Sequence, residues 1–304
     1  MKKLRSEPFP YADEYINYLE VERGLSLITV RSAISNLCNF AQFIKENYHF
    51  EFDPNQIKVK HIRGYLAYLK NNLGNGPSTR NNKISIIKGY FKFLELYDFL
   101  EEDTDPTRFI RKAKTPKPLP IYLTLEESIT LLKTAITKSE NPQQDHAVFR
   151  LLLQTGCRIG ELEKLKLSDL DLNQKYIKVT GKGNEQRLIP LTPNTCQALK
   201  QYLEFRACIP SRSDRLFINS KGNPLNRNVI AKSLRNLCFQ AGIDKPKLTL
   251  HKLRHTCLTL LLKAGVDLPV LKELAGHKKL STTVRYTHIT QKEIRQALNK
   301  HPFK

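Results

Sequence analysis

The chain has 304 residues, of which 40% are hydrophobic and 26% charged, as in ordinary globular proteins. This length is enough for two domains with separate cores. The N-terminal MKKLRSEPFP carries charge without an apolar run behind it, and no stretch reaches the ~18 apolar residues that cross a bilayer. We therefore expect no secretory leader, no membrane partner and a cytoplasmic location.

Positive charge is unevenly distributed along the chain, whose formal net charge is +21. Residues 1–112 hold 17 Lys and Arg against 14 Asp and Glu, whereas residues 113–304 hold 33 against 15. A large positive field attracts polyanions, and nucleic acid is the commonest of these. The charge thus indicates nucleic-acid binding, with a merely solubilising surface as the alternative.

The six cysteines indicate neither a metal site nor disulfides. None of them is spaced as CxxC, and no CxxC/HxxxH grouping occurs, so we predict no structural zinc site and no metal. They lie within helical patterns like small buried hydrophobes, which suits a reducing cytosol.

The N-terminal part reads as a bundle of four or five helices with short connections. Helices are predicted over 8–22, from a Ser26 cap through LITVRSAISNLCNFAQFIKEN, over 57–71, and from Ser78 onward. Some basic positions in this part could be DNA contacts or merely belong to a solvated face. These positions are Arg31, Arg80, Lys83 and Lys88.

A proline-rich stretch follows this bundle. Pro116, Pro118 and Pro120 stand close to Lys112, Lys114 and Lys117, and proline of this density forms an extended connector. We therefore predict a domain over 1–112, a linker over 113–124 and a second domain over 125–304.

The second domain is predicted to be mainly helical with a small sheet. A capping box of Thr124 and Glu127 begins a helix over 125–138. KYIKVTGKGNEQRLIPL (175–191) changes to a two-residue period around a Gly-rich turn, which predicts a β-hairpin with Lys182 at its tip. Further helices are expected over 145–155, 194–207, 226–241, 249–265, 267–276 and 291–300. The fold class is α+β, mainly α.

Six residues in this domain could form one reactive site: Arg158, Lys182, His251, Arg254, His277 and Tyr286. His251 and Arg254 stand at i and i+3, so they share a helix face. Arginines match phosphate oxygens, imidazoles move protons, and a phenol becomes a nucleophile where cations favour its oxyanion. Each residue alone also has an ordinary structural interpretation: His251 as a core histidine and Tyr286 as a buried tyrosine, for instance.

The order and context of these residues resemble the tyrosine recombinases, or phage integrase family. The segments that carry the resemblance are TGCRIGELEKLKLSDLD, the GKG hairpin, LTLHKLRHTCLTLLLKAG and LKELAGHKKLSTTVRYTHI. The family pattern is Arg, Lys, His-x-x-Arg, His or Trp, then Tyr, and every position is filled. The N-terminal bundle resembles the family's core-binding, SAM-like domain, and the two domains are expected to clamp DNA as a C.

The resemblance implies a role for each residue. Tyr286 would attack the scissile phosphate and form a 3′-phosphotyrosyl link, while Lys182 protonates the departing 5′-oxygen and His251 assists proton transfer at the tyrosine. Arg158, Arg254 and His277 would hold the non-bridging oxygens. Glu161 occupies the acidic position after the first Arg and is expected to orient it. No cofactor is implied.

The resemblance also implies partners. In the family, four protomers join two double-stranded DNA sites through a Holliday junction, and the C-terminal helix docks on a neighbour in trans. Ile294, Ala297 and Leu298 are candidates for that anchor, with packing in cis as the alternative. The outline is most similar to the Xer branch, which resolves chromosome or plasmid dimers, often with a second recombinase and a septal DNA translocase. A mobile-element integrase, a type IB topoisomerase and a non-catalytic architectural DNA-binding protein remain alternatives.

Overall fold

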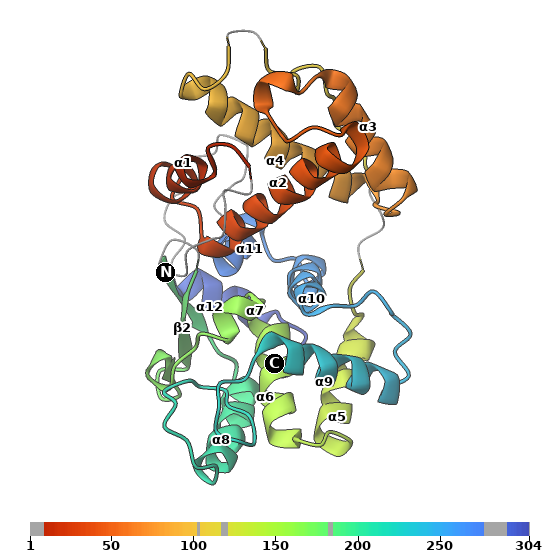
Figure 1. Ribbon diagram of the computed structural model, residues 1–304. Helices are drawn as coiled ribbons and strands as arrows, with labels where there is room; N and C mark the ends of the chain where they lie inside the picture. Colours follow the sequence, from red (N-terminus) through yellow and green to blue (C-terminus); the bar gives the residue numbers. More distant parts are fainter. Residues whose placement is uncertain (1–8, 102–103, 117–120, 182–184, 277–290, 304) are drawn as a thin grey trace. The chain divides into compact units, whose positions relative to one another are not determined.

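The chain divides into two compact units, Met1–Pro118 and Leu119–Lys304, each with its own hydrophobic core. The division falls inside the stretch 113–124, whose role as a linker stays a prediction. The computed structural model describes residues 9–101, 104–116, 121–181, 185–276 and 291–303, with the backbone alone described for 291–294. Figure 1 colours both units along the sequence.

The N-terminal unit is a helical bundle. Its segments in chain order are α1 (Ala12–Asn17), the π-helical turn η1 (Tyr18–Glu22), α2 (Leu27–Tyr48), the 3-10 turn η2 (Pro54–Gln56), α3 (Val59–Asn71) and α4 (Pro77–Leu96). The predicted Ser26 cap is confirmed, because its Oγ accepts the Thr29 N–H at 3.4 Å. The fourth helix begins at Pro77, one residue before the predicted start, because proline suits the first helical position.

Aromatic side chains fill the core of this bundle, in which α2 packs against α3 and α4. The Phe40 ring of α2 lies 5.1 Å from the Tyr65 ring of α3, centroid to centroid. On α4, the buried Tyr90 donates its hydroxyl hydrogen to the Pro10 carbonyl at 2.6 Å. This bond ties the segment just before α1 to the core of the bundle.

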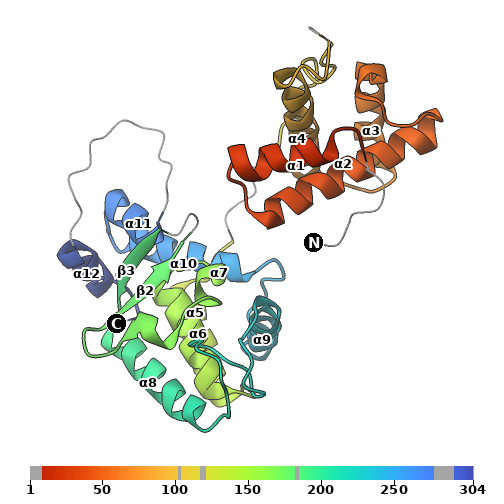
Figure 2. The same cartoon turned by 60° about the vertical axis from the view of Figure 1, so that its left-hand side comes forward.

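The C-terminal unit surrounds one buried helix, α6 (Pro142–Thr155), which contacts α5, α8 and α10. Figure 2 shows these helices beside the sheet. The other helical segments are α5 (Leu125–Thr137), α7 (Ile159–Leu162), η3 (Leu167–Asp169), α8 (Pro193–Ala207), α9 (Arg227–Gln240), α10 (Leu250–Lys263), α11 (Leu268–Ala275) and α12 (Gln291–Asn299). Among the described helices, none has the length and apolar character to cross a bilayer.

The predicted capping box at the start of α5 is confirmed. The Thr124 Oγ1 accepts the Glu127 N–H at 3.2 Å, and a Glu127 carboxylate oxygen accepts the Thr124 N–H at 2.7 Å.

The sheet of this unit has three antiparallel strands in the order β1 (Leu170–Asp171), β2 (Tyr176–Thr180) and β3 (Gln186–Pro190). The predicted hairpin is confirmed as β2 and β3, with Val179 opposite Arg187. The short β1 is an addition, since two residues carry too little alternation to be recognised. The prediction of a mainly helical chain with a small sheet is confirmed.

The helix α12 packs on β3 and α11 of its own chain. Ala297 and Leu298 are buried in the core of the C-terminal unit, while the side chain of Ile294 lies outside the description. The structure thus has this helix packed in cis, and docking in trans stays a prediction.

Candidate active site

The site begins where α6 gives way to α7. Gly156 ends α6 in the left-handed region, at φ +60°, and Arg158 follows in extended backbone as the N-cap of α7. The Arg158 side chain is 40% exposed. Arg158 is therefore more accessible to solvent than the buried Arg254.

Glu161, one turn into α7, binds Arg158 twice. Its Oε1 accepts a hydrogen bond from the Arg158 Nη1 at 2.9 Å, and its Oε2 accepts the Arg158 backbone N–H at 2.9 Å. Burial acts to raise the pKa of the Glu161 carboxyl, but the hydrogen bonds from Arg187 and Arg158 outweigh it, so the pKa lies below its ordinary value. Glu161 is therefore a fixed anion, only 4% exposed, that holds the neighbouring arginine.

Arg254, on the second turn of α10, is buried, with 3% of its surface exposed. Its Nη1 donates to the Gly156 carbonyl at 2.7 Å and its Nη2 to the Ala275 carbonyl at 2.6 Å. Burial, reinforced by the positive charge of Arg158, lowers the pKa of Arg254 to about 10. The guanidinium still carries its charge at neutral pH, and carbonyl oxygens compensate for its burial.

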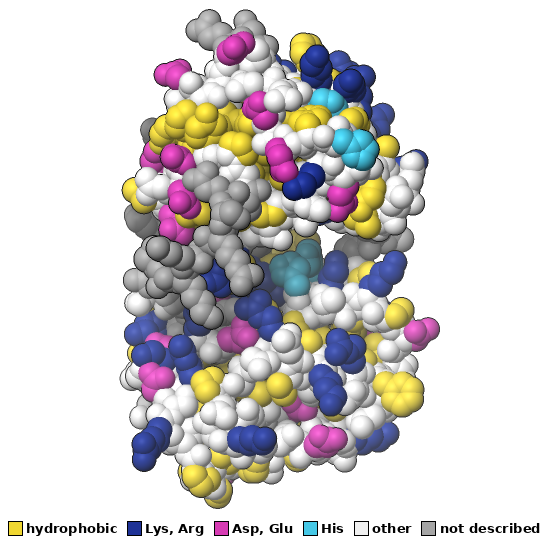
Figure 3. Space-filling view, in the orientation of Figure 1, with side chains coloured by type: hydrophobic (Ala, Val, Ile, Leu, Met, Phe, Trp, Pro, Cys, Tyr) yellow, Lys and Arg dark blue, Asp and Glu magenta, His cyan; other side chains and the backbone are white. Residues whose placement is uncertain are grey.

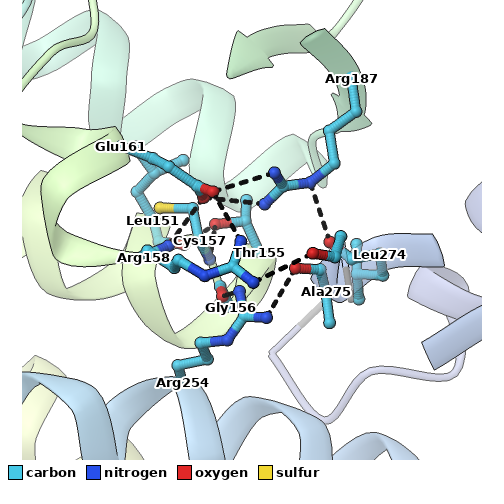
Figure 4. A network of polar contacts seen from close by, with 11 residues as sticks. Leu151, Thr155, Gly156, Cys157, Arg158, Glu161, Arg187, Arg254, Leu274 and Ala275 are labelled. Atoms are coloured by element: carbon cyan, nitrogen blue, oxygen red, sulfur yellow. Dashed lines mark hydrogen bonds and ion pairs between the residues drawn. The ribbon is translucent and has the colours of Figure 1, made fainter. Parts of the chain in front are cut away.

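Three arginines converge on the carboxyl end of α11, as Figure 4 shows. The successive carbonyls of Leu274, Ala275 and Gly276 accept hydrogen bonds from Arg187 Nε (3.2 Å), Arg254 Nη2 (2.6 Å) and Arg158 Nη2 (3.0 Å). The last carbonyls of a helix lack intrahelical donors and carry partial negative charge, which favours cations there. The helix end thus gathers guanidinium groups from three separate elements.

Arg187 was not among the residues predicted from the sequence. This β3 residue binds Glu161 with both ends of its guanidinium, Nη1 to Oε1 at 3.1 Å and Nη2 to Oε2 at 2.8 Å. A signal was present, because in RLIPL Arg187 shares a strand face with Ile189, which is buried. An arginine on a buried face needs an anionic partner.

Gly156 lies where α6 and α10 pack closely. A Cβ at this position would lie 3.1 Å from the Cys257 Sγ, so the thiol would have to move by a few tenths of an ångström. Burial raises the pKa of the Cys157 thiol to about 11 and that of Cys257 still further above its ordinary value. Both thiols beside Arg254 are therefore protonated at neutral pH and act as packing groups.

His251 lies one turn before Arg254 on α10, as the spacing predicted, but its environment is more open. Its side chain is exposed and contacts the His255 ring edge to face, with centroids 5.4 Å apart. It borders a surface pocket of about 260 Å³ that is also lined by Ile159 and Arg227. His251 is thus not the core histidine that the alternative interpretation proposed.

Three of the predicted site residues, Lys182, His277 and Tyr286, lie outside the described residues. The described part of the site contains three guanidinium groups, from Arg158, Arg187 and Arg254, against the single carboxylate of Glu161. Such a cationic cluster with one partly exposed arginine can bind an anionic group and stabilise charge that develops on it.

The candidate DNA contacts of the N-terminal unit differ in their surroundings. Arg31 on α2 is exposed, whereas Arg80, Lys83 and Lys88 on α4 are half-buried. The Arg80 Nη1 donates to the Asn75 carbonyl at 2.6 Å, and the Lys83 Nζ donates to the Asn36 Oδ1 at 2.9 Å. Arg80 and Lys83 thus have bonds within the bundle, and a role in DNA contact stays a prediction for all four.

Lys and Arg side chains outnumber Asp and Glu on the face of the C-terminal unit that Figure 3 presents. This agrees with the excess of 33 basic over 15 acidic residues between 113 and 304.

Comparison with known proteins identifies the family to which this chain belongs. A model of the phage integrase family matches residues 122–293, more than half of the chain. The chain belongs to the phage integrase family. A second model, the N-terminal SAM-like domain of phage integrases, matches residues 12–96 of this family member.

Two relatives show how far the similarity to this family extends. Tyrosine recombinase XerD of Staphylococcus saprophyticus is 33% identical over 296 residues, which covers 95% of this chain and 98% of the relative. Tyrosine recombinase XerC of Myxococcus xanthus is 32% identical over 300 residues, with coverage of 96% and 98%. The resemblance to Xer-type tyrosine recombinases is confirmed, and the chain is a DNA strand-transfer enzyme of site-specific recombination.

A solved structure of the family shares the fold. The XerH site-specific recombinase, in a pre-cleavage complex with its difH substrate, aligns with a TM-score of 0.69 at 24% identity. The alignment covers 94% of this chain and 82% of the XerH chain. The helical architecture with its small sheet is thus that of the phage integrase family.

Proposed function

We propose that this recombinase is of the Xer type and resolves chromosome or plasmid dimers by cutting and rejoining duplex DNA at a specific site. One observation carries the chemistry: the partly exposed Arg158 and the buried Arg254 are both anchored through their guanidinium groups to the carboxyl end of α11. The similarity to XerD and XerC over almost the whole chain supports the biological role.

In the proposed reaction, the Tyr286 oxygen attacks the scissile phosphorus. A tyrosyl O–P bond forms as the P–O5′ bond breaks, which leaves a 3′-phosphotyrosyl link and a free 5′-hydroxyl. His251 takes part in removing the phenol proton, and Lys182 supplies the proton to the 5′-oxygen. The energy of the broken bond is kept in the phosphotyrosine, so the strand can be rejoined.

Arg158 and Arg254, with His277, stabilise the charge on the non-bridging oxygens in this proposal. Preorganised donors act strongly because they need not reorganise as charge develops. The contacts of Arg158 to Glu161 and Gly276, and of Arg254 to Gly156 and Ala275, hold the two guanidinium groups in place before substrate binds.

The proposed assembly is a tetramer on double-stranded DNA that passes through a Holliday junction, with the two domains of each protomer clamped around the duplex. The tetramer could contain this chain alone or this chain with a second recombinase, and a septal DNA translocase could activate it. The DNA-bound form of the XerH relative supports a duplex DNA substrate. In the proposed assembly, α12 docks on a neighbouring protomer. We place this assembly in the cytoplasm of the host.

A covalent trapping assay tests the chemistry. Footprinting of the full chain on host DNA supplies the site, and a nick beside the scissile phosphate lets the short leaving fragment diffuse away. We expect a protein–DNA adduct with the wild type and none with Tyr286→Phe, because the variant lacks the nucleophilic oxygen. Denaturing gel electrophoresis detects the adduct. A wild type that binds the site but forms no adduct would show an architectural DNA-binding protein instead.

The position and use of the site test the biological role. A site near the replication terminus whose tandem copies recombine supports dimer resolution, whereas a site at the ends of a mobile element supports an integrase. Relaxation of supercoiled plasmid by the monomer without a specific site would indicate a type IB topoisomerase.

A further inference from the structure

Arg187 has a set of contacts unlike that of the other two arginines of the site. Its Nη1 and Nη2 bind the two carboxylate oxygens of Glu161, and its Nε binds the Leu274 carbonyl, so all three nitrogens of the guanidinium have partners. Its side chain is 14% exposed, whereas that of Arg158 is 40% exposed. Arg187 is therefore directed into the protein, toward the groups that hold Arg158.

Each partner of Arg187 stands next to a partner of Arg158. Both arginines bind the same Oε1 atom of Glu161, and both donate to the carboxyl end of α11, Arg187 to Leu274 and Arg158 to Gly276 (Figure 4). Glu161 and the helix end are thus the two supports of the Arg158 guanidinium. Arg187 joins these two supports to each other.

The positive charge of Arg187 also changes the net charge of the group that faces the phosphate. A pair formed by Arg158 and Glu161 alone has no net charge, so the carboxylate would offset the attraction of Arg158 for a phosphate. The guanidinium of Arg187 restores a net positive charge to the group. Its two-pronged bond to Glu161 also fixes the plane of a carboxylate that is only 4% exposed.

We propose that Arg187 is a positioning residue for strand cleavage. It holds Glu161 against the carboxyl end of α11 so that Arg158 is aimed at the scissile phosphate. The proposal rests on the proposed function of the site. A positioning role differs from a purely structural one because Arg187 then affects the cleavage rate through Arg158.

The test uses single-turnover cleavage of the nicked, footprinted site by the full chain. Arg187→Lys keeps the charge but cannot make a planar two-pronged bond, and we expect cleavage to slow about 10- to 100-fold at saturating DNA. DNA affinity and the thermal unfolding midpoint are expected to stay near those of the wild type. The matched control is Lys178→Gln on the adjacent strand, whose ion-pair partner is Asp169 rather than Glu161, and its cleavage rate should not change.

A double-mutant cycle decides whether the effect passes through Arg158. In an Arg158→Ala background, Arg187→Lys is expected to slow cleavage by less than about 3-fold, because residues that act as a unit are not additive. A substrate with a neutral methylphosphonate at the scissile position should likewise reduce the defect of Arg187→Lys, since the charge that Arg158 stabilises is gone.

Three results would overturn the proposal: wild-type cleavage by Arg187→Lys, an undiminished defect in the Arg158→Ala background, or loss of folding in Arg187→Lys, which would make the contribution one of stability. The failure of the wild type itself to form an adduct would contradict the proposed function instead, and the two failures are thereby distinguished.

Discussion

Glu161 organises the site at the scale of a single residue. Its two carboxylate oxygens accept four hydrogen bonds, two from Arg158 and two from Arg187. Because the pKa of the carboxyl lies below its ordinary value, the folded protein favours the ionised form more than the unfolded chain does. The contribution to stability is therefore complete above the ordinary pKa of 4.5 and is lost as the pH falls through the folded value.

We predict that Glu161→Gln lowers the free energy of unfolding at pH 7 by about 2 kcal/mol, since an amide cannot accept from two guanidinium groups with both of its ends. The wild type loses part of its free energy of unfolding below pH 4.5 because Glu161 becomes protonated, and the variant should not show this loss. Urea unfolding at pH 7 and in the acid range measures both effects.

The matched control is Glu163→Gln. Its partner Arg227 is 59% exposed, so the loss should stay below about 1 kcal/mol. Equal losses in the two variants would contradict the assigned importance of the Glu161 cluster.

At the scale of elements, the carboxyl end of α11 is the common attachment point of three arginines. Gly276 ends this helix at φ +61°, and an added Cβ would lie 3.0 Å from the Arg187 Nη1 and 3.2 Å from its Cζ. The glycine therefore meets two requirements at once: the left-handed end of the helix and the close approach of β3.

We predict that Gly276→Ala displaces the Arg187 guanidinium and slows cleavage about 10-fold or more at saturating DNA, because small misplacements at such sites are costly. Gly265→Ala is the control. Gly265 has φ +80°, but a Cβ there would meet no atom within 4 Å. Both variants should lose about 1 kcal/mol of stability from the strained backbone, measured by thermal unfolding. Equal cleavage rates in the two variants would disprove the importance of the contact with Arg187.

At the scale of the whole molecule, the net charge of +21 favours binding to the DNA polyanion. Each phosphate that a lysine or arginine neutralises releases counterions, so affinity falls as a power of the salt concentration. Arg31 on α2 is exposed and available for such a contact. Lys45 on the same helix is paired with Glu51 at 2.6 Å.

We predict that affinity for the footprinted duplex falls by on the order of 10³-fold between 50 and 200 mM salt. Arg31→Gln should reduce the slope of log K against log salt by about 1, as expected for one lost phosphate contact. Lys45→Gln should leave the slope unchanged. Fluorescence anisotropy titrations across the salt range measure these slopes, and an unchanged slope for Arg31→Gln would place Arg31 outside the DNA interface.

Features that depend on near neighbours in the chain could be predicted from the sequence alone. The 3.6-residue period located the helices, Thr124 and Glu127 marked the start of α5, and the Gly-rich turn between alternating residues marked the hairpin. The order of Arg, Lys, His-x-x-Arg, His and Tyr also identified the family, because side-chain chemistry in a fixed order is visible without coordinates. Two elements were not predicted, the π-helical turn at Tyr18–Glu22 and the two-residue β1, because neither has a local signal in the sequence.

The partners that hold the arginines in place became visible only in the folded chain. Arg158 donates to a carbonyl 118 residues away, and Arg187 binds a carboxylate 26 residues before it. A strand pattern can indicate that Arg187 is buried, but it cannot name the partner, because the partner depends on the path of the whole chain. For the same reason only the structure shows Ala297 and Leu298 buried within their own C-terminal unit. Hydrogen bonds and burial between distant segments are set by packing, which no local pattern of residues specifies.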